Sequence, residues 1–329
     1  MTAAEANLFS VRIPKGWELP ERMATPERAY FNRRKFLERM GMAAGVAAAT
    51  RVGLASTLPS TLLAAEETPK SPYPAPRNAK FTLDRPITAE KVATRYNNFA
   101  EFTHQKEAVW LLVDKFQIEP WTIKVRGLVN KPQTIDVHKL IREMPLEERL
   151  YRHRCIEAWS MAVPWTGFPF RKLIEMVEPR NDARYVRMLS FYRPDQAQGQ
   201  QQLKSWPWPD REALTMQEAM NDLAFMVTGL YGKPIPKQNG APIRIALPWK
   251  YGFKSLKSIE VIEFTDQQPQ TFWHEIAPTH HDFYANVDPR VPHPQWSQET
   301  ERDIETGERR KTILYNGYGD HVAHMYARR

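Results

Sequence analysis

The residues best suited to chemistry surround the single cysteine, Cys155, in the segment Arg-His-Arg-Cys-Ile-Glu-Ala-Trp-Ser at 152–160. A thiolate binds soft metals or attacks electrophiles, and flanking cations favour the thiolate over the thiol. In an extended strand, Arg152 and Arg154 would point away from the face that carries Cys155, where they could serve a bound anion or the protein core. These residues leave three roles open for Cys155: metal ligand, catalytic nucleophile or inert core residue.

A second group of residues has the composition of a phosphate site. An Asn-Gly turn at 239–240 leads into a short predicted strand with Arg244, and a glycine-containing loop follows that carries Lys250, Lys254 and Lys257. An arginine, several lysines and free backbone amides that lie close together make a phosphate cradle. An ordinary basic hairpin contains the same residue types, so the pattern alone leaves both interpretations open.

Zinc and nucleotide sites are not expected. The nine histidines form no His-x-x-x-His pair, and a single cysteine cannot form Cys-x-x-Cys. The chain also contains neither a Gly-x-Gly-x-x-Gly motif nor a Walker loop of the nucleotide-binding type, which disfavours a parallel nucleotide-binding sheet. The segment 96–102 offers an amide and a carboxylate among aromatic residues, and by itself it predicts only a polar turn.

Short strands, short helices and many prolines predict an irregular α+β fold with a single catalytic domain. Alternating apolar residues predict a strand at 121–128, and Asp136 is placed to cap a helix that buries Val137, Leu140 and Ile141. A helix at 170–177 would bury Leu173, Ile174 and Val177. Further strands are expected from Leu150 towards Cys155 and at 185–191, 243–247 and 259–264, with a short helix around 216–220.

The N-terminal region carries an export signal of the twin-arginine type. Residues 31–37 read Phe-Asn-Arg-Arg-Lys-Phe-Leu, and an apolar run of small residues follows at 40–50, too short to span a bilayer. An amphipathic helix that happens to contain two arginines is the alternative. We expect residues 1–65 to be a cleaved signal region, 66–80 a proline-rich linker and 81–329 the catalytic domain. Export in the folded state suggests a cofactor acquired in the cytosol.

Composition narrows the function further. The chain has 329 residues, of which 42% are hydrophobic, enough to bury a substantial core, and its formal charge is +8. No lysine-rich run or nucleic-acid motif accompanies that charge, so a DNA or RNA partner is not expected. The single cysteine excludes an intramolecular disulfide.

Taken in order, these segments resemble the catalytic subunits of periplasmic protein-methionine-sulfoxide reductases, molybdopterin enzymes with a sulfite-oxidase-type fold. The resemblance covers about residues 80–320 and rests on seven stretches. These are Tyr-Asn-Asn-Phe at 96–99, Arg-Cys-Ile-Glu-Ala-Trp-Ser-Met at 154–161, Val-Pro-Trp-Thr-Gly-Phe-Pro at 163–169, Gln-Asn-Gly-Ala-Pro-Ile-Arg at 238–244, Pro-Trp-Lys-Tyr-Gly-Phe-Lys at 248–254, Phe-Tyr-Ala-Asn-Val at 283–287 and Trp-Ser-Gln at 296–298.

The resemblance implies one molybdenum–molybdopterin cofactor per chain, with Cys155 as the metal ligand. The positions that match the family's pterin and phosphate contacts are Asn97, Ala100, Glu101, Ser190, Asn239, Arg244, Ser255, Leu256 and Lys257. Ser190 stands where the family commonly has threonine, and Ala100 where a relative has tyrosine. Tyr231, in a Gly-x-Tyr-Gly segment, would line the substrate mouth.

The implied activity is the reduction of methionine sulfoxide in periplasmic proteins by transfer of the sulfoxide oxygen to molybdenum. A haem-containing membrane subunit would supply electrons from the quinone pool to a monomeric catalytic subunit, and the site would be shallow and open. Three alternatives remain: a sulfite-oxidase-like molybdenum enzyme, a metal-free cysteine hydrolase with Cys155 as nucleophile, and a metal-free binding protein on the same scaffold.

Overall fold

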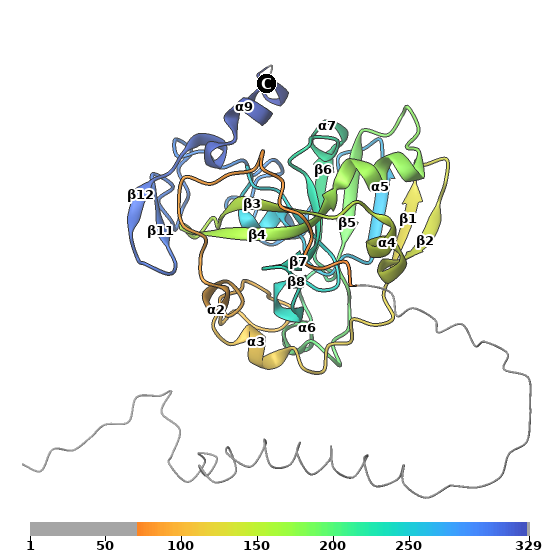
Figure 1. Ribbon diagram of the computed structural model, residues 1–329, viewed down its shortest axis with the longest axis horizontal. Helices are drawn as coiled ribbons and strands as arrows, with labels where there is room; N and C mark the ends of the chain where they lie inside the picture. The colour runs from red at the N-terminus through yellow and green to blue at the C-terminus, as the bar shows by residue number, and fades with distance from the viewer. Residues whose placement is uncertain (1–70, 328–329) are drawn as a thin grey trace, which may run out of the picture. The chain divides into compact units, whose positions relative to one another are not determined.

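Two mixed β-sheets form the framework of the computed structural model, which describes residues 71–327 (Figure 1). The predicted signal region, residues 1–65, lies outside the described residues. Within the described part of the chain, no helix is long and apolar enough to cross a membrane. Strands, short helices and long irregular connections alternate along the chain, as expected for an α+β fold.

The five-stranded sheet has the order β2-β1-β10-β5-β6, and only its β1–β10 pair is parallel. Its strands are β1 (Thr122–Gly127), β2 (Gln133–Asp136), β5 (Tyr185–Leu189), β6 (Arg211–Thr215) and β10 (Val261–Thr265). The apolar alternation predicted for β1 is confirmed, because Ile123 and Val125 are buried while Thr122 and Lys124 are exposed.

The seven-stranded sheet has the order β12-β11-β4-β7-β8, with β3 paired to β4 and β9 paired to β7. Its strands are β3 (Glu147–Arg154), β4 (Trp159–Pro169), β7 (Phe225–Leu230), β8 (Lys233–Pro234), β9 (Arg244–Ala246), β11 (Thr300–Asp303) and β12 (Arg309–Lys311). Every residue of β4 is buried, and this strand pairs with β3, β7 and β11. β4 is therefore the centre of the sheet that carries the candidate site.

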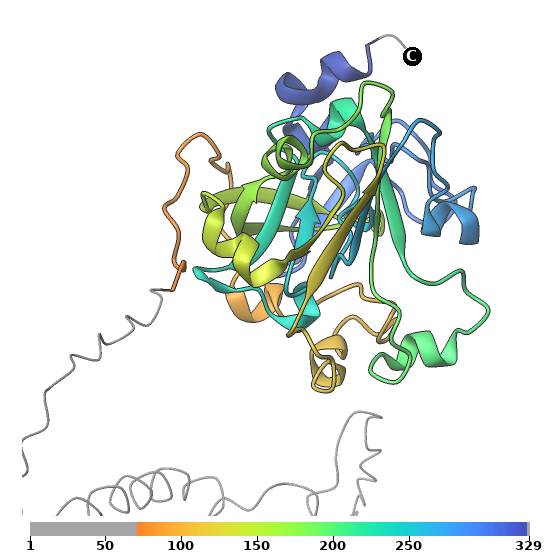
Figure 2. The same cartoon turned by 90° about the vertical axis from the view of Figure 1, so that its right-hand side faces the viewer.

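The helices are short, and two of them follow directly from local sequence. The Asp136 side chain accepts a hydrogen bond from Lys139 N at 2.7 Å and caps α4, and α5 buries Phe170, Leu173, Ile174 and Val177 on one face. The helices are α2 (Glu90–Ala93), α3 (Val109–Leu112), α4 (Val137–Glu143), α5 (Phe170–Val177), α6 (Gln198–Gln202), α7 (Met216–Ala219), α8 (Phe272–Ile276) and α9 (Gly319–Val322), with 3-10 turns at Lys237–Asn239, Gly252–Lys254, Leu314–Gly317 and Ala323–Met325. Figures 1 and 2 place α2 and α3 at one end of the sheets and α9 at the other.

The described part of the predicted linker, residues 71–80, runs along the catalytic domain. The Tyr73 hydroxyl donates to the Thr228 carbonyl at 2.8 Å. Further along, Asn78 N donates to the Glu148 carbonyl and Glu148 N to the Pro76 carbonyl, each at 2.8 Å. These bonds join the segment to the start of β3.

Two buried lysine–glutamate pairs hold the loop that follows β9. Lys250 Nζ lies 2.5 Å from Glu218 Oε1, and Lys254 Nζ lies 2.5 Å from Glu212 Oε2, with both lysine side chains fully buried. Of the two interpretations left open by the sequence, the phosphate cradle therefore does not hold for these two lysines. Each ammonium is already satisfied by a carboxylate from α7 or β6, which only the tertiary structure brings beside the loop.

Removal of one partner of the Lys254–Glu212 pair should be costly. In Lys254→Met the Glu212 carboxylate stays buried without its cation, and we expect a loss of roughly 3–5 kcal/mol in the free energy of unfolding. Urea unfolding of wild type and Lys254→Met measures this loss. The double variant Lys254→Met/Glu212→Leu should recover most of the loss, and a single variant within about 1 kcal/mol of wild type contradicts a buried ion pair.

Candidate cofactor site at Cys155

Cys155 begins the tight turn that joins β3 to β4. Its backbone N–H donates to the Trp159 carbonyl at 2.9 Å, and its carbonyl accepts from Ala158 N at 3.0 Å. Ala158 closes the turn with φ 63°, a conformation that few residues other than glycine adopt. The predicted strand towards Cys155 therefore starts earlier than expected, at Glu147, and ends one residue before the cysteine.

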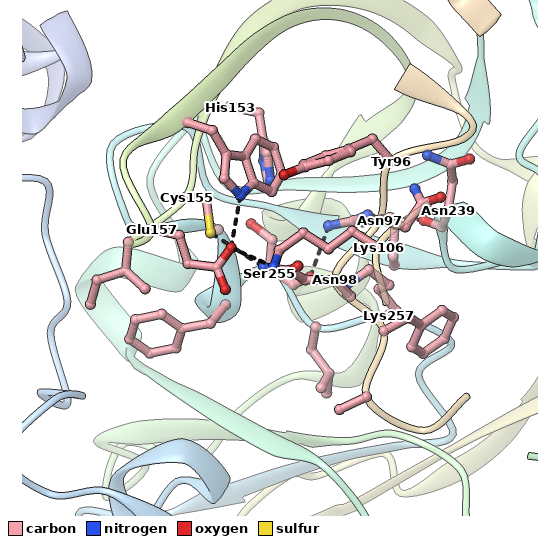
Figure 3. A pocket seen from close by; sticks show the side chains of 18 of the residues that line it. Tyr96, Asn97, Asn98, Lys106, His153, Cys155, Glu157, Asn239, Ser255 and Lys257 are labelled. Carbon is pink, nitrogen blue, oxygen red and sulfur yellow. Dashed lines mark hydrogen bonds and ion pairs between the residues drawn. The ribbon is translucent and has the colours of Figure 1, made fainter. Parts of the chain in front are cut away.

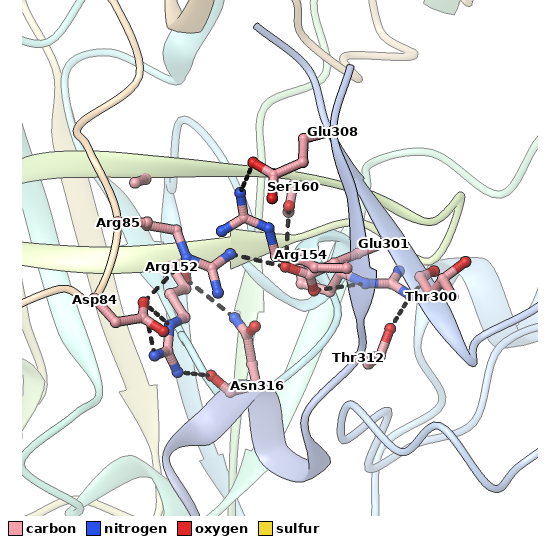
Figure 4. A network of polar contacts seen from close by, with 12 residues as sticks. Asp84, Arg85, Arg152, Arg154, Ser160, Thr300, Glu301, Glu308, Thr312 and Asn316 are labelled. Atoms are coloured by element: carbon pink, nitrogen blue, oxygen red, sulfur yellow. Dashed lines mark hydrogen bonds and ion pairs between the residues drawn. The ribbon is translucent and has the colours of Figure 1, made fainter. Parts of the chain in front are cut away.

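The guanidinium of Arg154 bonds this turn and belongs to a network of polar contacts with Glu301 (Figure 4). Its Nη1 donates to the Cys155 carbonyl, and its Nε lies 3.3 Å from Glu301 Oε2. Glu301 also accepts from Arg85 Nη1 at 2.8 Å and from Ser160 Oγ at 3.2 Å. The turn is thus tied through Arg154 to β11 and to the N-terminal segment of the domain.

Burial, together with the Glu157 carboxylate, raises the pKa of the Cys155 thiol to about 12, although the charges of Arg154 and Lys106 oppose both effects. The thiol is 4% exposed, and Asn98 Nδ2 donates to its sulfur at 3.4 Å. Arg154 favours the thiolate, as predicted, but burial outweighs its charge, and Arg152 pairs with Asp84 instead of acting on the sulfur. A thiol with so high a pKa loses its proton when a metal cation binds the sulfur in place of the proton.

The thiol lies in the wall of a cavity of about 330 Å³ (Figure 3). Four stretches of chain line it: 93–106, 153–165, 239–257 and 273–296, with Asp210 between them. Of the residues predicted to bind the cofactor, the structure brings to this cavity Asn97, Ala100, Glu101, Cys155, Asn239, Arg244, Ser255, Leu256 and Lys257. Segments distant in sequence therefore meet around one sulfur atom.

Two predicted site residues do not line this cavity. Ser190 lies behind it, where its hydroxyl donates to the Lys257 carbonyl at 2.8 Å and so supports the backbone of a lining residue. Tyr231 directs its hydroxyl to the Thr88 carbonyl on another part of the domain. The position of Tyr231 gives no support to a role at the substrate mouth.

The cavity contains two cations without a carboxylate partner. Arg244 donates to three carbonyls, those of Asn239 and Ser255 at 2.9 Å from its Nη atoms and that of Ile245 at 3.4 Å from Nε. Lys257 Nζ donates to the Asn98 carbonyl at 2.6 Å. No carboxylate of residues 71–327 lies within ion-pair distance of either. Burial lowers the pKa of Arg244 to about 9; burial together with the Arg244 charge lowers that of Lys257 to about 8. An anion placed here would relieve both charges.

Two amide oxygens also indicate what kind of ligand the cavity fits. Asn97 Oδ1 and Asn239 Oδ1 are buried on the cavity wall and have no hydrogen-bond partner. Buried polar atoms normally have a partner, so an unsatisfied pair facing one cavity indicates a ligand with N–H donors. A pterin ring supplies such donors and its phosphate supplies the anion, so these residues fit a molybdopterin.

Sequence reasoning missed several residues of this cavity. Asn98 lies inside the Tyr-Asn-Asn-Phe stretch, so its neighbourhood was recognisable, but its contact with sulfur was not. Lys106 and Asp210 carry no local signal, because the chain brings them to the cavity only through loops that fold back from distant elements. Lys106 is fixed there by a hydrogen bond from Asn97 N to its carbonyl, at 3.1 Å.

Comparison with known proteins agrees with this site. A family model described as the oxidoreductase molybdopterin binding domain matches residues 110–273. The protein-methionine-sulfoxide reductase catalytic subunit MsrP of Burkholderia mallei (strain ATCC 23344) is 44% identical over 318 residues, which cover 94% of each chain. The chain belongs to the family of protein-methionine-sulfoxide reductase catalytic subunits. This membership confirms the predicted oxidoreductase class, the molybdopterin cofactor and the sulfite-oxidase-type α+β fold.

A more distant likeness links the reductase to a solved structure, the sulfane dehydrogenase SoxCD from Paracoccus pantotrophus. The match has a TM-score of 0.41 and 12% identity, and it covers 67% of this chain and 57% of that one. At this level of similarity the comparison carries no argument about the site.

Two buried acids beside Lys257 make stability depend on pH. Burial raises the pKa of Glu101 to about 7, against the opposing charge of Lys257, and burial with the Glu101 charge also raises that of Asp210. Between about pH 4.5 and 7 the folded cofactor-free protein holds a proton on Glu101 that the unfolded chain has lost, so stability should fall as pH rises. Relative to wild type, Glu101→Gln should gain roughly 1–3 kcal/mol between pH 5 and 7.5.

Urea unfolding of the cofactor-free proteins at the two pH values measures this gain. Asp266→Asn, at an exposed position, is the control for loss of a carboxylate. An equal stability difference between Glu101→Gln and wild type at both pH values would show that Glu101 does not titrate in this range.

Proposed function

We propose that this chain reduces methionine sulfoxide side chains of proteins with a molybdenum–molybdopterin bound at Cys155. The observation that carries the proposal is a buried thiol in a cavity with unpaired cations and unpartnered amides, in a chain of this reductase family. The reaction consumes two electrons and two protons and releases the thioether and water.

The cavity residues would divide the work of holding the cofactor. Cys155 is the metal ligand, Arg244 and Lys257 neutralise the phosphate, and the oxygens of Asn97 and Asn239 accept hydrogen bonds from the pterin. Ser190 acts indirectly, through the backbone of Lys257. Further contacts come from Ala100, Glu101, Ser255 and Leu256.

When bound, the cofactor supplies the electron pair and the acceptor for the sulfoxide oxygen. The protein fixes the geometry around it. Arg154 immobilises the turn that carries Cys155, and Asn98 orients the sulfur by its hydrogen bond. Burial of the turn keeps water from the sulfur, which strengthens these polar contacts.

Aromatic side chains on the cavity wall suit a methionine-derived substrate. The wall includes Tyr96, Trp159, Phe253, Trp273 and Trp296. The unbranched side chain of methionine sulfoxide can reach a recessed thiol, and its methylene and methyl groups can pack on these rings. The thiol, 4% exposed, lies deeper than the shallow, open site that the resemblance implied. A protein substrate would insert such a side chain from a flexible surface segment.

The location and partners form part of the same proposal. The twin-arginine stretch at 31–37 supports export of the folded protein to the periplasm, with 1–65 as signal region, 66–80 as linker and 81–329 as catalytic domain. The relative is named as a catalytic subunit. We infer a haem-containing membrane subunit as electron donor from the quinone pool, a monomeric catalytic subunit, and oxidised periplasmic proteins as substrates.

The alternative functions fit the site less well. Sulfite is an anion, and the Lys106–Glu157 pair beside the sulfur has no net charge to attract it. A cysteine hydrolase needs a histidine bonded to its nucleophile. Within residues 71–327, however, the hydrogen bond to the Cys155 sulfur comes from Asn98.

The direct test compares wild type with Cys155→Ser, both matured in cells that make the cofactor. Wild type should carry about one molybdenum per chain and reduce methionine sulfoxide in an oxidised protein with a reduced viologen dye as donor. The variant should lose at least about 100-fold in kcat, because the soft ligand of the metal is gone. Metal analysis and the dye assay measure both quantities.

Ser205→Ala, an exposed position away from the cavity, is the control. Fully matured wild type that holds molybdenum but oxidises sulfite and leaves sulfoxides unchanged would replace the proposal with the sulfite-oxidase alternative. Unchanged sulfoxide reduction in Cys155→Ser would rule out the ligand role.

A further inference from the structure

Lys106 is a cation on the cavity wall to which we have assigned no contact with the cofactor. Its Nζ lies 3.0 Å from Glu157 Oε2, and both side chains are 23% exposed. The charges of both groups act on the Cys155 thiol, and Figure 3 shows the ammonium and the carboxylate beside the sulfur. Arg244 and Lys257, which we assign to the phosphate, do not belong to this pair, and Lys106 and Glu157 line the same cavity as Cys155.

The Lys106 ammonium is held in place by a short relay. Glu157 Oε2 accepts from Lys106 and from Trp159 Nε1, at 3.0 Å in each case. Trp159 belongs to the buried strand β4, and its ring packs edge-on against Tyr96 at 5.2 Å between centroids. A free lysine side chain is mobile. Because these contacts already order the Lys106 side chain, substrate binding loses less conformational entropy.

The Lys106–Glu157 pair has no net charge, which suits a neutral ligand. An ammonium has three N–H donors, and Glu157 is the acceptor that the described residues provide for it, so donors remain for a ligand. Because the carboxylate balances the ammonium, the pair has little net attraction for free anions. A sulfoxide is neutral, with a strongly polar S–O bond whose oxygen only accepts hydrogen bonds, and a thioether lacks this oxygen.

From this arrangement we propose that Lys106 binds the sulfoxide oxygen of the substrate, with Glu157 and Trp159 positioning its ammonium. The inference rests on the proposed function and adds to it the group that distinguishes substrate from product. Once the oxygen has left, the thioether has no acceptor of comparable strength for Lys106, which favours product release. Lys106 is thus a specificity-determining residue at the metal site.

Ligand binding to the holoenzyme tests the proposal without turnover. Two peptides of one sequence are compared, one with methionine sulfone, which keeps S–O oxygens, and one with methionine. Wild type should bind the sulfone peptide more tightly, and Lys106→Met should reduce this preference about 10-fold or more, because a hydrogen bond to a charged group is lost. Titration calorimetry gives both dissociation constants, and Lys106→Arg should keep most of the preference.

Lys115→Met, at an exposed position outside this cavity, is the matched control, with molybdenum content and melting temperature measured for each protein. Equal weakening of both peptides in Lys106→Met would indicate a merely structural role and overturn the inference. Wild type that reduces sulfoxide yet binds both peptides equally would also overturn it, while the proposed function stands. Wild type with no sulfoxide reduction would overturn both.

Discussion

The Arg154 guanidinium, fully buried between Cys155 and Glu301, is the contact on which the site depends. Taking a guanidinium out of water is costly, and the ion pair with Glu301 and the bond to the Cys155 carbonyl offset that cost only while β11 lies beside β4. The turn at Cys155 is therefore fixed only after the two distant strands have paired. A ligand sulfur held this firmly can impose its position on a metal, which a cysteine on a flexible loop could not do.

The cavity differs from this well-paired turn, because the protein leaves some of its polar groups without a partner of opposite charge or without a hydrogen bond. Arg244 and Lys257 have carbonyl partners instead of carboxylates, and the Asn97 and Asn239 oxygens have none. These groups destabilise the folded protein until a ligand of complementary charge and hydrogen bonding fills the space. A ligand that binds the native state alone stabilises it, so cofactor binding and completion of the fold are coupled. That coupling gives a physical reason for the export in the folded state that we propose.

The same loop shows how differently three lysines can be used. Lys250 and Lys254 turn into the core against Glu218 and Glu212, while Lys257 turns into the cavity. Lys106, from another loop, uses a third arrangement, a half-buried pair that keeps donors free. The three arrangements differ in their partners: Lys250 and Lys254 are paired with carboxylates in the core, Lys257 donates to the Asn98 carbonyl, and Lys106 shares Glu157 with Trp159.

The sequence by itself determined the elements whose signals are local and some of the residues that meet at the cavity. The cap at Asp136, the apolar face of α5 and the alternation in β1 are set within a few residues, and the family resemblance identified Cys155, Asn97 and Arg244. Only the tertiary structure decided the direction of the thiol pKa, the burial of Lys250 and Lys254, the place of Tyr231 and the presence of Lys106. The reason is physical: burial and charge pairing depend on partners from distant strands and loops, and no local pattern records which side chains will meet there.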